Sequence, residues 1–139
     1  MEPTSSQQPS SVPSLSDDTW LLRGIDQTHH VTDDGRIKSS AFLTLKLSVH
    51  ILSLDSVKFL TGRDPPFRYI AAVSVRDCRE IGDLQIEVTP KEGEPGHVSI
   101  CGTNKGRARK LRNRARWVEA SGTPEQVYGE LCAECGVSP

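Results

Sequence analysis

Short segments in which apolar and polar residues alternate constrain the fold of this chain more than any other feature. The clearest case is the segment 45–52, whose odd positions are all apolar: Leu45, Leu47, Val49 and Ile51. The same alternation occurs in 84–88, and the apolar-rich segments 20–25 and 97–101 have the length of strands. A repeat of two is the period of a β-strand with one buried face. The sequence therefore predicts several short strands.

The segments between these strands give weaker signals. Residues 33–35 (DDG) predict a turn before an extended piece at 37–43. Asp55 or Ser56 is placed to cap a short helix that Gly62 ends. The apolar run 69–75 fits a buried strand followed by a helical turn to residue 81, and it fits one continuous helix equally well, because periodicity does not separate the two.

The C-terminal third predicts two helices. After Gly102, apolar residues recur at positions 108, 111, 115 and 118, which is helical spacing. Thr123-Pro124-Glu125-Gln126 then has the pattern of a helix start, with a capping residue, a proline and a glutamine in order. The predicted fold is α+β, with a small mostly antiparallel sheet and two C-terminal helices.

Length and composition predict one domain after a tail. The chain has 139 residues, and residues 1–19 are rich in Ser, Pro and Gln with almost no apolar surface to bury. We therefore expect a disordered tail over 1–19 and a single α+β domain over 20–139. No run of ~18 apolar residues occurs and residues 1–19 do not resemble a signal peptide, which predicts a cytoplasmic protein that does not span a membrane.

Charge is distributed unevenly along the chain. The net charge is -1, yet the segment 105–116 contains seven basic residues and no acidic one, so the rest carries an excess of eight acidic groups. Such asymmetry indicates a local anion-binding surface. The alternative is that these cations pair with acids of the same domain.

The loop before the basic helix strengthens the anion hypothesis. Gly102 and Asn104 lie between a predicted strand and a predicted helix, where unpaired backbone N–H groups favour an anion. The spacing matches neither a P-loop nor a dinucleotide fingerprint, so no cofactor is predicted. The main prediction is a non-enzymatic binding or accessory module that contacts nucleic acid, or another phosphate-bearing or acidic partner, through 102–116. The predicted binding residues are Gly102, Asn104, Lys105, Arg107, Arg109, Lys110, Arg112, Arg114 and Arg116, with Arg109, Arg112 and Arg116 on one side of the helix.

Two histidine motifs offer an enzymatic alternative. The elements 30–32 (HVT) and 97–99 (HVS) resemble the paired His-x-Thr/Ser motifs of the 2H phosphoesterases. The resemblance implies that His97 and His30 act as general acid and base on a phosphate-bearing substrate.

A second enzymatic alternative is weaker. Arg23, the Ser39-Ser40 pair and 85–87 (QIE) resemble the Arg, Ser and Gln-x-Glu elements of ADP-ribosyltransferases. The resemblance implies binding of NAD. Strand alternation already explains Gln85 and Glu87 as residues that face solvent.

The four cysteines do not form a metal motif. Cys132 and Cys135 form a CxxC, but the second CxxC or HxxxH that would complete a zinc site is absent from the sequence. Buried free thiols are the favoured interpretation, and no metal is predicted.

One resemblance spans most of the chain. Over about 20–118, the order of SSAF, LSV, YIAAVSV, HVSI followed by glycine, and a basic helix ending in RWV resembles a family of small bacterial proteins of unknown function. The resemblance implies a compact intracellular domain and associates His97 and the basic helix with its role. A purely structural protein–protein interaction domain is the third alternative.

Overall fold

The computed structural model describes residues 15–25, 30–64 and 67–139. Its elements occur in a mixed order along the chain. They are β1 (Trp20–Ile25), the 3-10 helix η1 (Ser39–Phe42), β2 (Lys46–Ile51), α2 (Leu54–Thr61), β3 (Tyr69–Ser74), α3 (Val75–Ile81), β4 (Gln85–Val88), β5 (His97–Cys101), α4 (Lys105–Arg114), β6 (Arg116–Glu119) and α5 (Pro124–Cys135).

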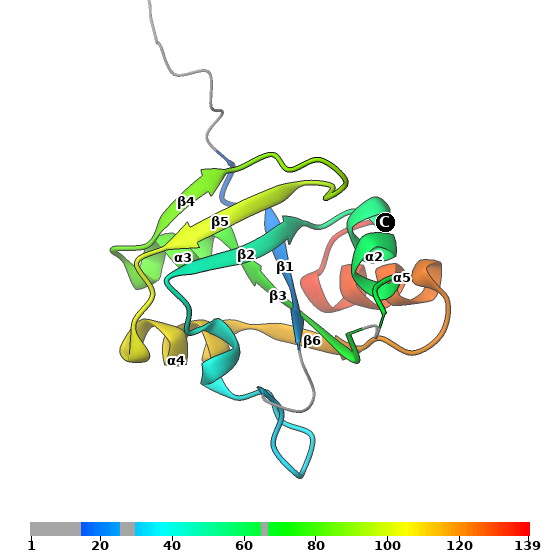
Figure 1. The fold of residues 1–139 in the computed structure, drawn as a ribbon, viewed down its shortest axis with the longest axis horizontal. Helices are drawn as coiled ribbons and strands as arrows, with labels where there is room; N and C mark the ends of the chain where they lie inside the picture. Colours follow the sequence, from blue (N-terminus) through cyan, green and yellow to red (C-terminus); the bar gives the residue numbers. More distant parts are fainter. Residues whose placement is uncertain (1–14, 26–29, 65–66) are drawn as a thin grey trace, which may run out of the picture.

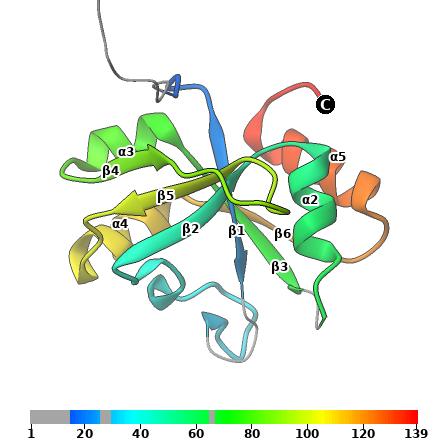
Figure 2. The ribbon, with the colours of Figure 1, turned by 45° about the horizontal axis from the view of Figure 1, so that its top comes forward.

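Within the described residues, six strands form one sheet in the order β4-β5-β2-β1-β3-β6 (Figure 1). Every pair of neighbouring strands is antiparallel. The view in Figure 2 shows the sheet strongly twisted, with β2 and β5 crossing the direction of β1 and β3. The predicted α+β class, with an antiparallel sheet and the C-terminal helices α4 and α5, is confirmed.

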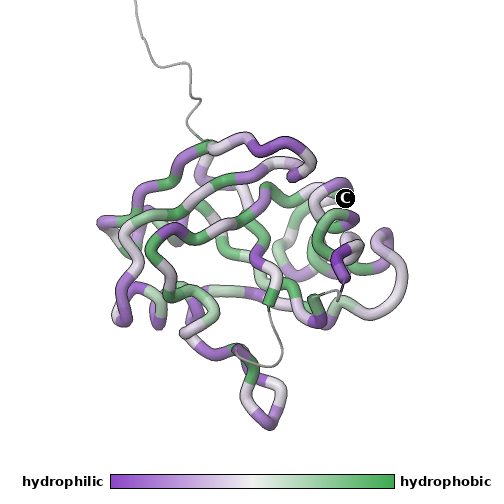
Figure 3. Tube along the Cα trace, viewed as in Figure 1, coloured by the Kyte–Doolittle hydropathy of each residue, from purple (hydrophilic) through white to green (hydrophobic). Residues whose placement is uncertain are grey.

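The sheet buries apolar residues on both faces. The larger cluster joins β1, β2, β3 and β5 to η1, α3 and α4, and Phe42 and Leu111 are fully buried in it. The smaller cluster joins Leu22 and Ile70 of the sheet to α2 and α5. Figure 3 shows hydrophobic residues along the central strands and hydrophilic residues around α4. Helices thus cover both faces of the sheet.

The N-terminal boundary of the domain differs from the prediction. Residues 1–14 of the predicted tail lie outside the described residues. In the remaining part, the backbone N–H of Val75 donates to the Thr19 carbonyl at 2.9 Å and that of Arg76 donates to the Asp17 carbonyl at 3.1 Å. Leu15 packs against the larger core cluster. Residues 15–19 therefore belong to the folded domain.

Two predictions in the middle of the chain need correction. The extended piece at 37–43 is instead the 3-10 helix η1, which buries Ala41 and Phe42. The cap of α2 is Ser53, whose Oγ accepts from the backbone N–H of Ser56 at 3.0 Å. In 69–81, the interpretation as a strand followed by a helix is confirmed.

The basic helix is shorter than its apolar spacing predicts. It ends at Arg114, because Ala115 adopts an extended conformation and the next residues pair with β3, Trp117 opposite Ala71. Arg116 therefore lies on the strand β6, and the predicted helical side of Arg109, Arg112 and Arg116 does not exist. The following helix starts as predicted, with Thr123 and Gln126 forming a capping box.

Candidate functional site

The neighbouring strands β2 and β5 carry apolar residues on one face and polar residues on the other. Their buried positions Leu47, Val49, Val98 and Ile100 all belong to the larger core cluster. Because side chains alternate along a strand, the residues between them face the opposite side. The register places Ser48 opposite Ser99 and His50 opposite His97. Two serines and two histidines therefore gather on one patch of the sheet.

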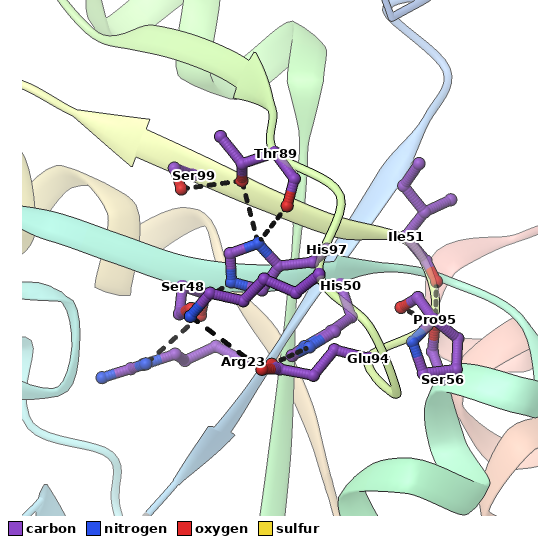
Figure 4. A network of polar contacts seen from close by, with 11 residues as sticks. Arg23, Ser48, His50, Ile51, Ser56, Thr89, Glu94, Pro95, His97 and Ser99 are labelled. Carbon is purple, nitrogen blue, oxygen red and sulfur yellow. Dashed lines mark hydrogen bonds and ion pairs between the residues drawn. The ribbon is translucent and has the colours of Figure 1, made fainter.

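A chain of hydrogen bonds runs through His97 (Figure 4). Nδ1 of His97 lies 2.8 Å from both the backbone carbonyl and the hydroxyl of Thr89, and Nε2 contacts Oγ of Ser48. A carbonyl oxygen only accepts, so Nδ1 of His97 carries the proton. In the neutral ring, Nε2 is then the acceptor and the Ser48 hydroxyl donates to it. His97 itself is only 3% exposed.

The second histidine pairs with a carboxylate. Nε2 of His50 donates to Oε1 of Glu94 at 3.2 Å, and the His50 ring lies 5.3 Å from that of His97 between centroids. Burial lowers the pKa of His50, and the hydrogen bond to Glu94 opposes this effect only in part. His50 is therefore neutral near pH 7. Its Nδ1 is buried without a hydrogen-bond partner among the described residues.

Ser48, His50 and Glu94 line a small cavity of about 170 Å³. Its polar lining includes Arg23, Ser48, His50, Arg63 and Glu94, and its apolar wall consists of Phe59, Leu60 and Phe67. Arg23 is fixed in place, because its Nε donates to the Ala41 carbonyl and its Nη1 to the Ser48 carbonyl, both at 3.2 Å. The guanidinium of Arg63 lies over the rings of Phe59 and Phe67. The cavity thus combines cations with aromatic walls.

The charges around this cavity favour an anion over a metal ion. His50, Glu94 and His97 offer donor atoms within 4.8 Å of one another, which is a set that could hold a divalent cation. However, Arg23 and Arg63 line the cavity and Nζ of Lys91 lies 3.9 Å from Glu94, which leaves an excess of positive charge. Both ring nitrogens of His97 are also engaged.

In the predicted loop-helix site, the structure gives Gly102 and Asn104 backbone roles. Gly102 has a φ of 95° and its carbonyl accepts from Arg107 at 2.7 Å. Oδ1 of Asn104 caps α4 by accepting from the backbone N–H of Arg107 at 2.8 Å. One of the N–H groups expected to meet an anion is therefore satisfied by the protein itself.

The basic residues divide into two groups. Three have partners within the protein: Arg107 pairs with Asp83, Arg114 with Asp77 and Glu80, and Arg112 donates to the Ile37 carbonyl at 2.9 Å. The others form no ion pair among the residues that the structure describes: Lys105, Arg109, Lys110 and Arg116. Internal pairing thus accounts for part of the basic segment only.

A second concave surface lies between η1 and α4. This groove, of about 550 Å³, is lined by Thr32, Ile37, Lys38, Ser39, Ser40, Arg109, Arg112 and Asn113. Three of these described residues are cations and none is acidic. We call it the η1–α4 groove. It brings two of the predicted binding residues, Arg109 and Arg112, together with Lys38, which the sequence interpretation did not select.

The two histidines of the predicted pair have different hydrogen-bond partners in the structure. Nδ1 of His30 lies 3.1 Å from Oγ of Ser40 beside η1. The ring nitrogens of His97 bond to Thr89 and Ser48, and His50 is its neighbouring imidazole. Of the elements that resemble ADP-ribosyltransferases, Arg23 lines the cavity, Ser39 and Ser40 line the η1–α4 groove, and Gln85 and Glu87 are exposed.

The cysteines give a testable expectation. Burial raises the pKa of the Cys78 and Cys135 thiols to about 12, so both thiols stay almost entirely protonated at pH ~8. We expect iodoacetamide to leave both unmodified in the folded protein and to alkylate both after unfolding in guanidinium, as measured by peptide mass spectrometry. Alkylation of the folded protein at the rate of cysteine in an unfolded peptide would contradict this expectation.

Four residues of the cavity and of the hydrogen-bond chain beside it were not recognised from the sequence. Ser48, Thr89, Glu94 and Arg63 lie on different segments, and only the antiparallel pairing of β2 with β5 brings Ser48 to His97. The available signal was the matching alternation of serine and histidine with apolar residues in the two strands.

Comparisons of the chain with protein-family models, curated proteins and solved structures found no match. Within the described part of the chain, no helix has the length and apolar character needed to cross a membrane.

Proposed function

We propose that the protein is a binding module whose η1–α4 groove holds the phosphate backbone of a nucleic acid. The observation that carries this proposal is the combination of three cations with three hydroxyl side chains and no acidic residue among the described lining. Arginine, lysine, serine, threonine and asparagine are the residues that contact nucleic-acid phosphates most often.

The groove favours binding that does not depend on sequence. No aromatic side chain is among its described lining residues, so it has no platform on which a base could stack. Arg112 is held in place by the Ile37 carbonyl and by Asn113, which reduces the entropy lost on binding. Lys105 and Lys110 add to the same helix charge that forms no ion pair among the described residues.

The state of the cysteines supports a cytoplasmic location for the proposed binding module. All four cysteines of the chain lie in the described residues and are free. Free thiols in place of disulfides are typical of a reducing compartment, which supports a cytoplasmic location.

The test is a salt titration of binding to short DNA and RNA duplexes and to single strands, measured by fluorescence polarisation with the full chain. Three phosphate contacts predict that log K falls with log salt concentration with a slope of about -3. Lys38→Gln and Arg109→Gln are each expected to weaken binding about tenfold near 0.1 M salt and to make the slope shallower by about 1.

A matched control uses Lys58, an exposed cation on α2 that does not line the groove. Lys58→Gln removes the same charge and should leave affinity and slope unchanged. Equal losses for all three variants, or binding of an acidic peptide in place of every nucleic acid, would overturn the proposal in favour of a general charge effect or of an acidic protein partner.

A further inference from the structure

We propose that Ser48 is a nucleophile, activated by His97 as general base, and that the cavity beside it accepts small esters that carry an anionic group. This activity goes beyond the binding function proposed above and does not depend on it, because the η1–α4 groove and the cavity share no described lining residue.

The order of the hydrogen bonds is the order that nucleophilic catalysis requires. A serine hydroxyl is a weak nucleophile unless a base within hydrogen-bond distance takes its proton, and that base must be oriented by a third group. Here Ser48 Oγ contacts Nε2 of His97, and Nδ1 of His97 lies 2.8 Å from the Thr89 carbonyl. The carbonyl holds the proton on Nδ1, which leaves the lone pair of Nε2 to accept the proton of Ser48.

Ser48 is more accessible to solvent than His97, as a nucleophile and its base require. Ser48 is half-buried and lines the cavity, whereas His97 is buried behind it. A substrate in the cavity therefore meets the hydroxyl first. The Thr89 hydroxyl also contacts Ser99 Oγ at 2.9 Å, so the residue that orients His97 is itself held in place.

The cavity also defines the substrate class. Its volume of about 170 Å³ admits a short acyl chain, and Phe59 and Phe67 provide apolar contact for it. Arg63 lies on the rings of both phenylalanines and is placed to pair with a carboxylate at the end of that chain. Glu94 is already engaged by His50 and Lys91.

The reaction uses water as its only co-reactant. Ser48 Oγ forms a bond to the ester carbonyl carbon while its proton passes to Nε2 of His97. The bond from that carbon to the alcohol oxygen then breaks, and His97 returns the proton to the leaving alcohol. Water next attacks the acyl-serine, again through His97, and releases the acid. Arg23 lines the cavity and is placed to stabilise the oxyanion of each tetrahedral intermediate.

The first experiment treats the full chain with a fluorophosphonate probe, in which a serine oxygen displaces fluoride from phosphorus. Intact-mass and peptide spectrometry should show one adduct, located at Ser48. Ser48→Ala should abolish the adduct, and Ser121→Ala is the control that should retain it, because Ser121 is exposed and does not line the cavity. His97→Gln should slow labelling about 100-fold or more.

A second variant, Ser48→Cys, keeps the proposal testable if Ser48→Ala does not fold. The thiol introduced by Ser48→Cys keeps the shape of the serine, and its alkylation by iodoacetamide should be faster with His97 present than in the double variant with His97→Gln. Absence of a wild-type adduct at Ser48, or equal labelling of several serines, would overturn the proposal.

Substrate class is tested by hydrolysis of two fluorogenic esters, 4-methylumbelliferyl butyrate and the anionic 4-methylumbelliferyl hydrogen glutarate. The anionic ester should have the higher kcat/KM, and Arg63→Gln should remove that preference mainly through KM. Equal values of kcat/KM in the wild type would overturn the anionic-substrate part of the proposal. Ser48→Ala should leave duplex binding unchanged, so the two proposals fail separately.

Discussion

Replacing Phe42 with alanine is expected to lower the free energy of unfolding by about 3–5 kcal/mol. Among the described residues, Phe42 has the largest fully buried side chain. It lies in the core cluster that joins η1, α4 and the sheet. Truncation removes its buried ring from the core and leaves a cavity that the surrounding residues fill only in part. Urea unfolding monitored by tryptophan fluorescence measures the change.

The loss of Phe42 is also expected to affect both proposed sites, because Phe42 lies in η1. It ends η1, which supplies Ser39 and Ser40 to the η1–α4 groove and the Ala41 carbonyl that holds Arg23. Leu45→Ala is the control, because Leu45 is 90% exposed and its truncation should change stability by about 0.5 kcal/mol or less. Similar losses for both variants would show that η1 is not anchored through Phe42.

The alternation of the sequence was sufficient to predict β2 and β5, but not where the buried face begins. Leu45 fits the pattern of odd apolar positions and yet lies outside β2, exposed to solvent. Periodicity records which residues share a face, whereas the end of a strand depends on where its partner ends. β5 pairs with β2 only from Lys46 onward.

Long-range pairing also explains the wrong end of the basic helix. Ala115 and Val118 continue the helical spacing of Ala108 and Leu111, so the local pattern predicts one helix. In the folded chain, Val118 instead pairs with Ile70 at the edge of the sheet. Strand pairing of this kind joins residues that are distant in the sequence, and local helix propensity is a weak prior against it.

The candidate sites were predictable to different extents for the same reason. The basic segment was evident from composition, but its ion pairs were not, because Arg114 meets acids more than thirty positions away. Ser48 and His97 are 49 positions apart. Strand alternation alone marks both as polar residues on a sheet face, and only the register of β2 against β5 turns them into a bonded pair.

Replacing Gly102 with alanine is expected to lower the free energy of unfolding by about 2–4 kcal/mol. Gly102 has a φ of 95°, which L side chains rarely adopt, and an added Cβ would lie 2.5 Å from the backbone carbonyl oxygen of Asp83. Because the obstacle is backbone, it cannot rotate away as a flexible side chain would. Thermal or urea unfolding of the variant gives the measurement.

Gly106→Ala is the matched control and should have the opposite sign. Gly106 lies inside α4, where an added Cβ meets only Oδ1 of Asn104 at an ordinary 3.6 Å, so alanine should stabilise the helix by about 0.5–1 kcal/mol. The Gly102 variant also tests whether the loop before the basic helix has only a structural role or also binds phosphate. If Gly102 serves the backbone alone, the destabilised variant should still bind duplexes with wild-type affinity wherever it is folded, because Lys38 and Arg109 are unchanged. A loss of affinity in the folded variant would instead assign the loop itself to the phosphate site.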